Sequence, residues 1–266
     1  GYDYVTPIYS RHKYDGTITN NICFPLVYGI LGRSIRQPIG GDFALSQNLI
    51  EYLIKQSWHR TTKEYGIDIF MTLNSILGGF KISEVGLGAK IHKPSAPKLG
   101  PMFLQVVSTA FLMVTRTLHK WKNIENIKEC PLFGLRNLAQ PQDLDVDKDA
   151  ILEKSFVEYK ENADALNKFL KPENLTLVEK VFASKDNINK LDAHLWCKIV
   201  YNMIFAFGKA TDKAQVVQAL RPLYFGRVVS FMNQTWDIST LETEKFITEQ
   251  ADIFFENRNY LIDLLS

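Results

Sequence analysis

The chain contains 266 residues, of which 46% are hydrophobic and 23% are charged, values typical of a globular protein with a sizeable core. Lys and Arg (31) nearly balance Asp and Glu (29) and form no basic run, which argues against nucleic acid as a partner. The longest apolar run, MFLQVVSTAFLMV at 102–114, is shorter than the ~20 residues that a membrane-spanning helix needs. We therefore expect no membrane span.

The cysteines and the N-terminus bear on the compartment. Cys23, Cys130 and Cys197 form no CxxC pair and no spacing typical of a metal site. Scattered thiols are typical of a reducing compartment, and no basic segment followed by an apolar core indicates a secretory signal. We therefore predict a cytoplasmic protein. The chain begins without Met, which is compatible with processing, a tag remnant or a fragment of a longer protein.

Short apolar stretches alternate with turn signals over roughly the first 98 residues. The predicted elements are, in chain order, a strand at 2–9, a helix at about 16–31, a helix at about 47–56, a helix at about 67–77 and a strand at 80–88. Pro25 predicts a kink or break in the first helix, Ser46 is expected to cap the second, and Gly78 to end the third. This mixture indicates an α/β layer, with too few strands for a complete doubly wound sheet.

From Leu99 onward the apolar spacing is helical. Helices are predicted from about 99 and near 148–170, 174–184, 189–208, 213–233 and 239–265. One apolar stripe is expected to form the core of a helix bundle: Leu191, Leu195, Ile199, Met203 and Phe207. A polar, proline-bearing stretch separates the two regions. We therefore predict an α/β portion at 1–125, a linker at 126–147 and a mostly helical domain at 148–266.

Two segments in the first region carry polar groups that suit a ligand. Gly40, Gly41 and Asp42 precede an apolar run, and they form either a plain loop or one that a ligand can approach closely because no Cβ intervenes. Arg11 opens RHKYDGTITN, a segment rich in donors that includes Thr19. Donors placed ahead of a helix N-terminus suit a phosphate or a carboxylate.

Two further residues have both a structural and a functional interpretation. Asp68, at the start of a predicted helix, either favours the helix macrodipole by about 0.3–1 kcal/mol or stands at the mouth of a site, where it could pair with Asp42. His92 follows a predicted strand in GLGAKIHKPSAP, and a lone loop histidine is more often a surface residue than a metal ligand. The acidic DLDVD at 143–147 lacks the preceding apolar strands of a metal-binding Asp-x-Asp motif, so we reject it as one.

Taken in order, YSRHKYDGTIT, RQPIGGDFALS, YGIDIFMTL and GAKIHKP resemble the acceptor half of retaining nucleotide-sugar glycosyltransferases. The families with the most similar pattern are mannosylglycerate synthase and glucosyl-3-phosphoglycerate synthase, and the resemblance covers about residues 1–120. It implies part of the nucleotide-sugar transferase fold known as GT-A. It also implies transfer of a hexose to glycerate, 3-phosphoglycerate or a similar small hydroxy acid.

The resemblance also implies roles for individual residues. Arg11 and Thr19 match the residues that contact the acceptor's carboxylate or phosphate, and the loop of Gly40, Gly41 and Asp42 matches the place where donor sugar and acceptor meet. Asp68 matches an acidic residue that reaches the transferred sugar or the acceptor. His92 matches a ligand of a divalent metal, Mn²⁺ or Mg²⁺, which neutralises the departing diphosphate.

One large departure from the family pattern limits this expectation. The family's nucleotide-binding half, with its Asp-x-Asp motif, does not occur in this sequence. We therefore expect residues outside the chain to complete the metal site, and no transferase activity from these 266 residues alone. Two alternatives stay open: a helical assembly or interaction module, in which the chain could form a homo-oligomer, and a non-catalytic protein that keeps a sugar-binding fold.

Overall fold

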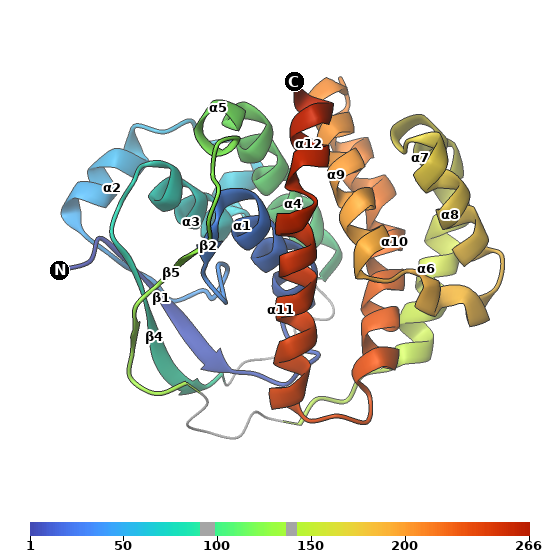
Figure 1. The fold of residues 1–266 in the computed structure, drawn as a ribbon, viewed down its shortest axis with the longest axis horizontal. Coiled ribbons are helices and arrows are strands. Elements are labelled where there is room, and N and C mark those ends of the chain that lie inside the picture. Colours follow the sequence, from blue (N-terminus) through green and yellow to red (C-terminus); the bar gives the residue numbers. More distant parts are fainter. Residues whose placement is uncertain (91–98, 137–142) are drawn as a thin grey trace. The chain divides into compact units, whose positions relative to one another are not determined.

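The structure is a computed structural model, and it describes residues 1–90, 99–136 and 143–266 (Figure 1). The chain divides into two compact units, Gly1–Leu144 (unit 1) and Asp145–Ser266 (unit 2). Unit 1 combines helices with a small mixed sheet, whereas all described elements of unit 2 are helices. The predicted mixture of an α/β portion and a helical remainder therefore holds at this coarse level.

The sheet of unit 1 has four strands in the order β3-β1-β4-β6. They are β1 (Tyr4–Ser10), β3 (Ala44–Leu45), β4 (Ile82–Ala89) and β6 (Leu132–Phe133). The long strands β1 and β4 pair in parallel along their whole length and run side by side in Figure 1. β3 is antiparallel to β1, and β6 is parallel to β4. The carboxyl ends of β1 and β4 therefore meet at one edge of the sheet.

Part of the segment expected to be a linker is structured. β5 (Lys128–Glu129) pairs in parallel with β2 (Arg33–Ser34) and forms a second, two-stranded sheet. β6 comes from the same segment, and at only two residues it is too short for sequence alternation to reveal.

The helices that the structure describes in unit 1 are η1 (a π-helix, Thr19–Cys23), α1 (Phe24–Leu31), α2 (Gln47–Ile54), η2 (a 3-10 helix, Thr61–Lys63), α3 (Ile67–Leu77), α4 (Leu99–Arg116) and α5 (Leu118–Trp121). Two of the predicted local signals, Ser46 and Gly78, act as expected. The Ser46 hydroxyl accepts a hydrogen bond from the Leu49 amide (3.2 Å) and caps α2. α3 ends before Gly78, and Gly32 ends α1 in the left-handed conformation.

Pro25 changes the first predicted helix in a specific way. The segment does not simply kink, because a π-helix at Thr19–Cys23 leads directly into α1, with Pro25 in its first turn. Proline lacks an N–H and its ring crowds the carbonyl four residues earlier. A wider π turn, closed by the Phe24 amide on the Thr19 carbonyl, relieves that conflict.

The core of unit 1 lies between the sheet and its longer helices. The strand β1 contributes the buried Tyr4 and Ile8, and one apolar face of α4 is buried. Its members are Val106, Val107, Ala110, Phe111 and Val114. The helices α3 and α4 pack against each other. This core fixes β1 and α3, the two elements that carry Arg11 and Asp68 at their ends.

Unit 2 consists of α6 (Lys148–Glu161), α7 (Ala163–Phe169), α8 (Pro172–Phe182), η4 (a 3-10 helix, Lys185–Lys190), α9 (Ala193–Lys209), α10 (Lys213–Thr235), α11 (Thr240–Glu256) and α12 (Arg258–Leu265). The helix α10 is central, because it packs against α6, α7, α9 and η4 and buries most of its length. The predicted stripe from Leu191 to Phe207 is buried, as expected for a bundle core.

Two predicted helices of unit 2 are each divided in two. Asn162 ends α6 and Asn257 ends α11, and each donates its side-chain amide to the carbonyl four residues earlier, Glu158 and Ile253, at 2.8 Å. An asparagine that bonds the backbone in this way competes with the helix. Apolar periodicity continues past both residues, which explains why it does not reveal the break.

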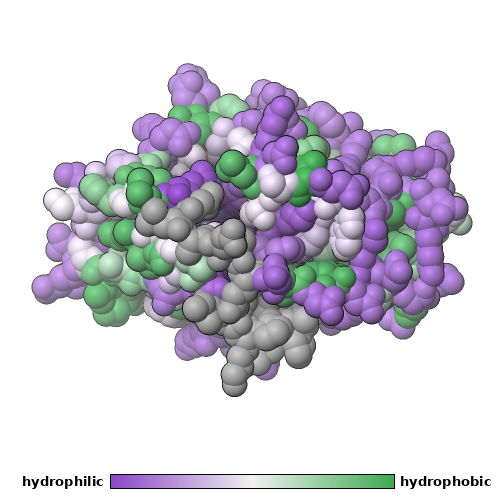
Figure 2. Space-filling model, turned by 90° about the horizontal axis from the view of Figure 1, so that it is seen from below, coloured by the Kyte–Doolittle hydropathy of each residue, from purple (hydrophilic) through white to green (hydrophobic). Residues whose placement is uncertain are grey.

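No helix among the described residues combines the length and the apolar character needed to cross a membrane. On the face drawn in Figure 2, hydrophilic and hydrophobic residues are interspersed in small groups.

Candidate functional site

The carboxyl ends of β1 and β4 place two cations side by side. Arg11 directly follows β1 and Lys90 directly follows β4, and the Lys90 amide donates to the Ser10 carbonyl (3.2 Å). The Arg11 guanidinium and the Lys90 ammonium both donate to the carbonyl oxygen of Gly40, at 3.4 and 3.2 Å. Ligands of α/β sheets bind at this edge. The two cations therefore converge where a ligand is expected.

Asp42 is held by donors from both strands. The Tyr9 hydroxyl donates to Asp42 Oδ2 at 2.6 Å, and Lys90 Nζ donates to the same oxygen at 2.7 Å. The Lys90 ammonium also lies 4.2 Å from the centre of the Tyr9 ring. The bonds from Lys90 and Tyr9 lower the pKa of Asp42, whereas burial and the bond to Asp42 raise the pKa of Tyr9 to about 12. We call these residues the Tyr9–Asp42–Lys90 cluster.

Asp68 lies in the first turn of α3, within electrostatic reach of the cluster. Burial raises its pKa from 3.8 to about 6; the charge of Lys90 opposes that rise and the charge of Asp42 adds to it. No residue in the described ranges donates a hydrogen bond to the Asp68 carboxylate. Sequence alone left the separation of Asp42 and Asp68 open, and in the structure the charge of Asp42 contributes to the raised pKa of Asp68. A carboxyl group that titrates near neutral pH can accept or donate a proton at such a site.

Gly40 and Gly41 are required for reasons internal to the chain. A Cβ at Gly40 would stand 2.5 Å from Pro7 Cγ, so only glycine lets this loop pack on β1. Gly41 has a φ of +94°, a conformation that side chains with a Cβ rarely adopt. The loop is also tied to β1 by Gln37, whose amide donates to the Tyr9 carbonyl (2.8 Å) and accepts from the Tyr9 amide (3.2 Å). The glycines therefore shape the loop whether or not a ligand approaches it.

Arg11 and Thr19, eight positions apart in sequence, flank Gly16. A Cβ at Gly16 would lie 3.6 Å from both Arg11 Nη1 and Thr19 Oγ1. Thr19 is buried in the π-helix. Arg11 pairs with Asp15 (3.4 Å), yet its buried Nε meets no acceptor in the parts of the chain that the structure describes. The Arg11 guanidinium therefore has one N–H without an acceptor among the described residues.

The predicted metal ligand His92 lies outside the described residues. Within the described ranges, no three side chains of His, Cys, Asp or Glu gather in a way that could hold a metal ion. Asp42 Oδ2 is already engaged by Tyr9 and Lys90.

Sequence reasoning missed Tyr9 and Lys90. Lys90 stands two positions before His92 in GAKIHKP, and Tyr9 lies on a strand predicted from alternation. Nothing local distinguishes either from a surface residue. Only the parallel pairing of β1 and β4 shows that Tyr9 and Lys90 are neighbours, because it places Tyr9 opposite Gly88 and Ser10 opposite Ala89.

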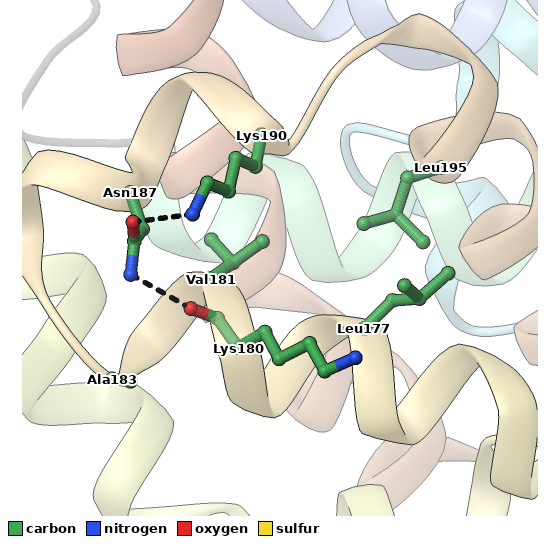
Figure 3. A pocket seen from close by; sticks show the side chains of 7 residues that line it. All are labelled: Leu177, Lys180, Val181, Ala183, Asn187, Lys190 and Leu195. Atoms are coloured by element: carbon green, nitrogen blue, oxygen red, sulfur yellow. Dashed lines mark hydrogen bonds between the residues drawn. The ribbon is translucent and has the colours of Figure 1, made fainter.

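Unit 2 contains a cavity of about 350 Å³ beside α8, η4 and α9 (Figure 3). Leu177, Val181 and Leu195 line it, and Lys190 donates to Asn187 (2.7 Å) beside it. The described residues that line it include no carboxylate, histidine or cysteine. The cavity therefore offers hydrophobic contact but no acid–base pair and no metal ligand set.

A scan of the chain against models of protein families finds no match, and a search among curated proteins finds no significant relative. The function must therefore be inferred from the chemistry of the sheet edge and from the sequence motifs that meet there.

Proposed function

We propose that unit 1 is the acceptor side of a metal-dependent, retaining nucleotide-sugar glycosyltransferase. One observation carries the proposal: Arg11, the Gly40–Asp42 loop and Lys90 contact one another at the carboxyl edge of β1 and β4, and the charges of all three segments act on Asp68. The same four segments carry the resemblance to mannosylglycerate synthase and glucosyl-3-phosphoglycerate synthase. The acceptor would be glycerate, 3-phosphoglycerate or a similar small hydroxy acid.

The site offers complementary groups for such an acceptor. Arg11, whose buried Nε has no acceptor among the described residues, can bind a carboxylate or a phosphate next to Thr19. Asp68 accepts no hydrogen bond from a described residue and has a pKa near 6, so it can accept one from an acceptor hydroxyl. A hydroxy acid carries both an anionic group and a hydroxyl group, so a site that binds the two together can recognise it.

The reaction retains the configuration of the sugar in this proposal. Asp42 and Asp68 orient hydroxyl groups and stabilise positive charge at the anomeric carbon, and neither attacks that carbon. His92 and residues outside the chain would hold a divalent metal, and such a metal would supply positive charge for the departing nucleotide diphosphate. The nucleotide-binding half must come from sequence other than these 266 residues, so this chain by itself is expected to bind the acceptor without transferring sugar.

Acceptor binding is the first test. Isothermal titration of the 266-residue chain with 3-phosphoglycerate and with glycerate should show binding of at least one. Arg11→Ala should weaken it about 10- to 100-fold, because a charge-assisted hydrogen bond contributes roughly 1.5–3 kcal/mol. Arg60→Ala is the matched control, because the Arg60 side chain is 93% exposed and should leave binding unchanged. The proposed acceptor site would be contradicted if the chain bound neither acid, or if Arg11→Ala bound the acid as tightly as the control Arg60→Ala.

Transfer is the second test and requires a protein that also contains the nucleotide-binding half. A panel of nucleotide sugars should yield a glycosylated hydroxy acid with retained configuration, in a reaction that depends on Mn²⁺ or Mg²⁺. His92→Ala should remove the metal dependence, and an unchanged metal-dependent rate would exclude His92 as a ligand. Acceptor binding without transfer to any acid would favour the alternative of a non-catalytic sugar-binding protein.

A further inference from the structure

We propose that Lys90 is a positioning residue that acts through Asp42, holding one oxygen of its carboxylate so that the other faces the ligand. The inference rests on the proposed function, because it assigns Lys90 to the same acceptor site. Among the described residues, Tyr9 and Lys90 donate hydrogen bonds to the Asp42 carboxylate, and each falls on Oδ2. No residue of the described ranges bonds Oδ1, and the Asp42 side chain is 59% exposed.

The two donors come from adjacent strands, which makes the arrangement rigid. Tyr9 lies near the end of β1, and Lys90 follows the end of β4. The Gln37 amide clamps both backbone groups of Tyr9, at 2.8 and 3.2 Å. An exposed carboxylate on a glycine loop would otherwise rotate freely. Two donors anchored in a paired sheet select one orientation of Asp42 and so reduce the entropy lost when a ligand hydroxyl binds.

The Lys90 ammonium is more constrained than that of a surface ion pair. It bonds Asp42 and the Gly40 carbonyl and lies over the Tyr9 ring, while its side chain is only 20% exposed. Exposed ion pairs usually leave a lysine largely solvated and contribute little. Lys90 instead ties the first and last residues of the Gly40–Asp42 loop to the carboxyl edge of the sheet.

Lys90 also opposes the rise that burial produces in the pKa of the second carboxylate, Asp68. Its charge favours the ionised form of Asp68, as does that of Arg11, whereas Asp42 disfavours it. Removing the Lys90 charge should therefore raise the pKa of Asp68 above its present value of about 6.

The experiment compares Lys90→Met, Lys90→Arg and Tyr9→Phe in the complete transferase, with Lys63→Met, at an exposed position, as the control. Lys90→Met should lower kcat more than it raises the acceptor KM, by about 10- to 100-fold in kcat/KM. The acid limb of its pH profile should move to higher pH. Lys90→Arg keeps the positive charge, so it should recover part of kcat and the acid limb of the parent's pH profile. Tyr9→Phe should lower kcat without moving the acid limb.

A second measurement reads the Lys90–Asp42 interaction without any activity. Carbon NMR of the Asp42 carboxyl in the 266-residue chain should show a higher pKa in Lys90→Met than in the parent, and no change in Lys63→Met. The inference would be overturned if the Lys90→Met transferase kept the kinetic constants of the parent and if the pKa of Asp42 did not change in Lys90→Met. An inactive parent transferase would instead contradict the proposed function, and the Asp42 titration would still decide whether Lys90 holds that carboxylate.

Discussion

Asp68 makes the stability of unit 1 depend on pH. Its pKa is 3.8 in an unfolded chain and about 6 in the folded one, because burial disfavours the charged form. The folded state therefore binds the proton more tightly than the unfolded state does. The free energy of unfolding should fall as pH rises from about 4 to about 6. Above that range it should stay lower by the full free-energy cost of burying the charged Asp68 carboxylate.

Asp68→Asn should remove this penalty. At pH 3.5 the variant and the parent should be equally stable, whereas at pH 7.5 the variant should be more stable by about 1–3 kcal/mol. Urea denaturation at the two pH values measures the difference. Glu84→Gln serves as the comparison, because burial raises the pKa of Glu84 from 4.5 to about 7. The free-energy cost of its buried charge should therefore grow over a higher pH range than that of Asp68. The same stability difference for Asp68→Asn at both pH values would contradict the assignment.

At the scale of elements, short-range signals decide where helices begin and end. Ser46 caps α2, and Ser239 caps α11 with a capping box in which Glu242 bonds back to it. Asn162 and Asn257 stop helices whose apolar pattern continues beyond them. Each signal acts within four residues, which is the reach of a helical hydrogen bond.

Ser46→Ala should lower the free energy of unfolding of unit 1 by about 1 kcal/mol. The substitution removes the acceptor for the Leu49 amide (3.2 Å) and the donor to Asp3 Oδ1 (2.9 Å). Asn48→Ala is the matched control, because Asn48 is exposed in the same turn and should change stability by less than about 0.5 kcal/mol. Chemical denaturation measures both variants. Equal effects would mean that Ser46 does not act as a cap.

At the scale of the whole molecule, each unit has its own buried core. Ile30 is fully buried in unit 1 and Ile199 in unit 2. Ile30→Val and Ile199→Val should each lower the stability of their own unit by about 0.5–1.5 kcal/mol. Calorimetry, with hydrogen exchange to assign each transition, should show that each variant shifts one transition. A single transition that both variants shift equally would mean that the chain unfolds as one cooperative body.

The site was only partly predictable from sequence. Arg11, the Gly40–Asp42 loop and Asp68 were recognisable because charged residues and paired glycines stand out beside predicted helices and strands. The sequence did not show that these segments lie close together in space. It also did not show that Tyr9 and Lys90 hold Asp42. Asp42 is 33 positions from Tyr9 and 48 positions from Lys90, and no local pattern encodes such a contact.

The sequence by itself determined the mixed and helical regions, the caps at Ser46 and Gly78, and the buried stripe that begins at Leu191, because each depends on residues within a turn or a face. Only the tertiary structure decided the parallel pairing of β1 and β4 and the two-residue strands β5 and β6. It also showed that Gly40 is required by its contact with Pro7. Strand pairing joins residues that are distant in sequence, and this pairing built the Tyr9–Asp42–Lys90 cluster at the edge of the sheet.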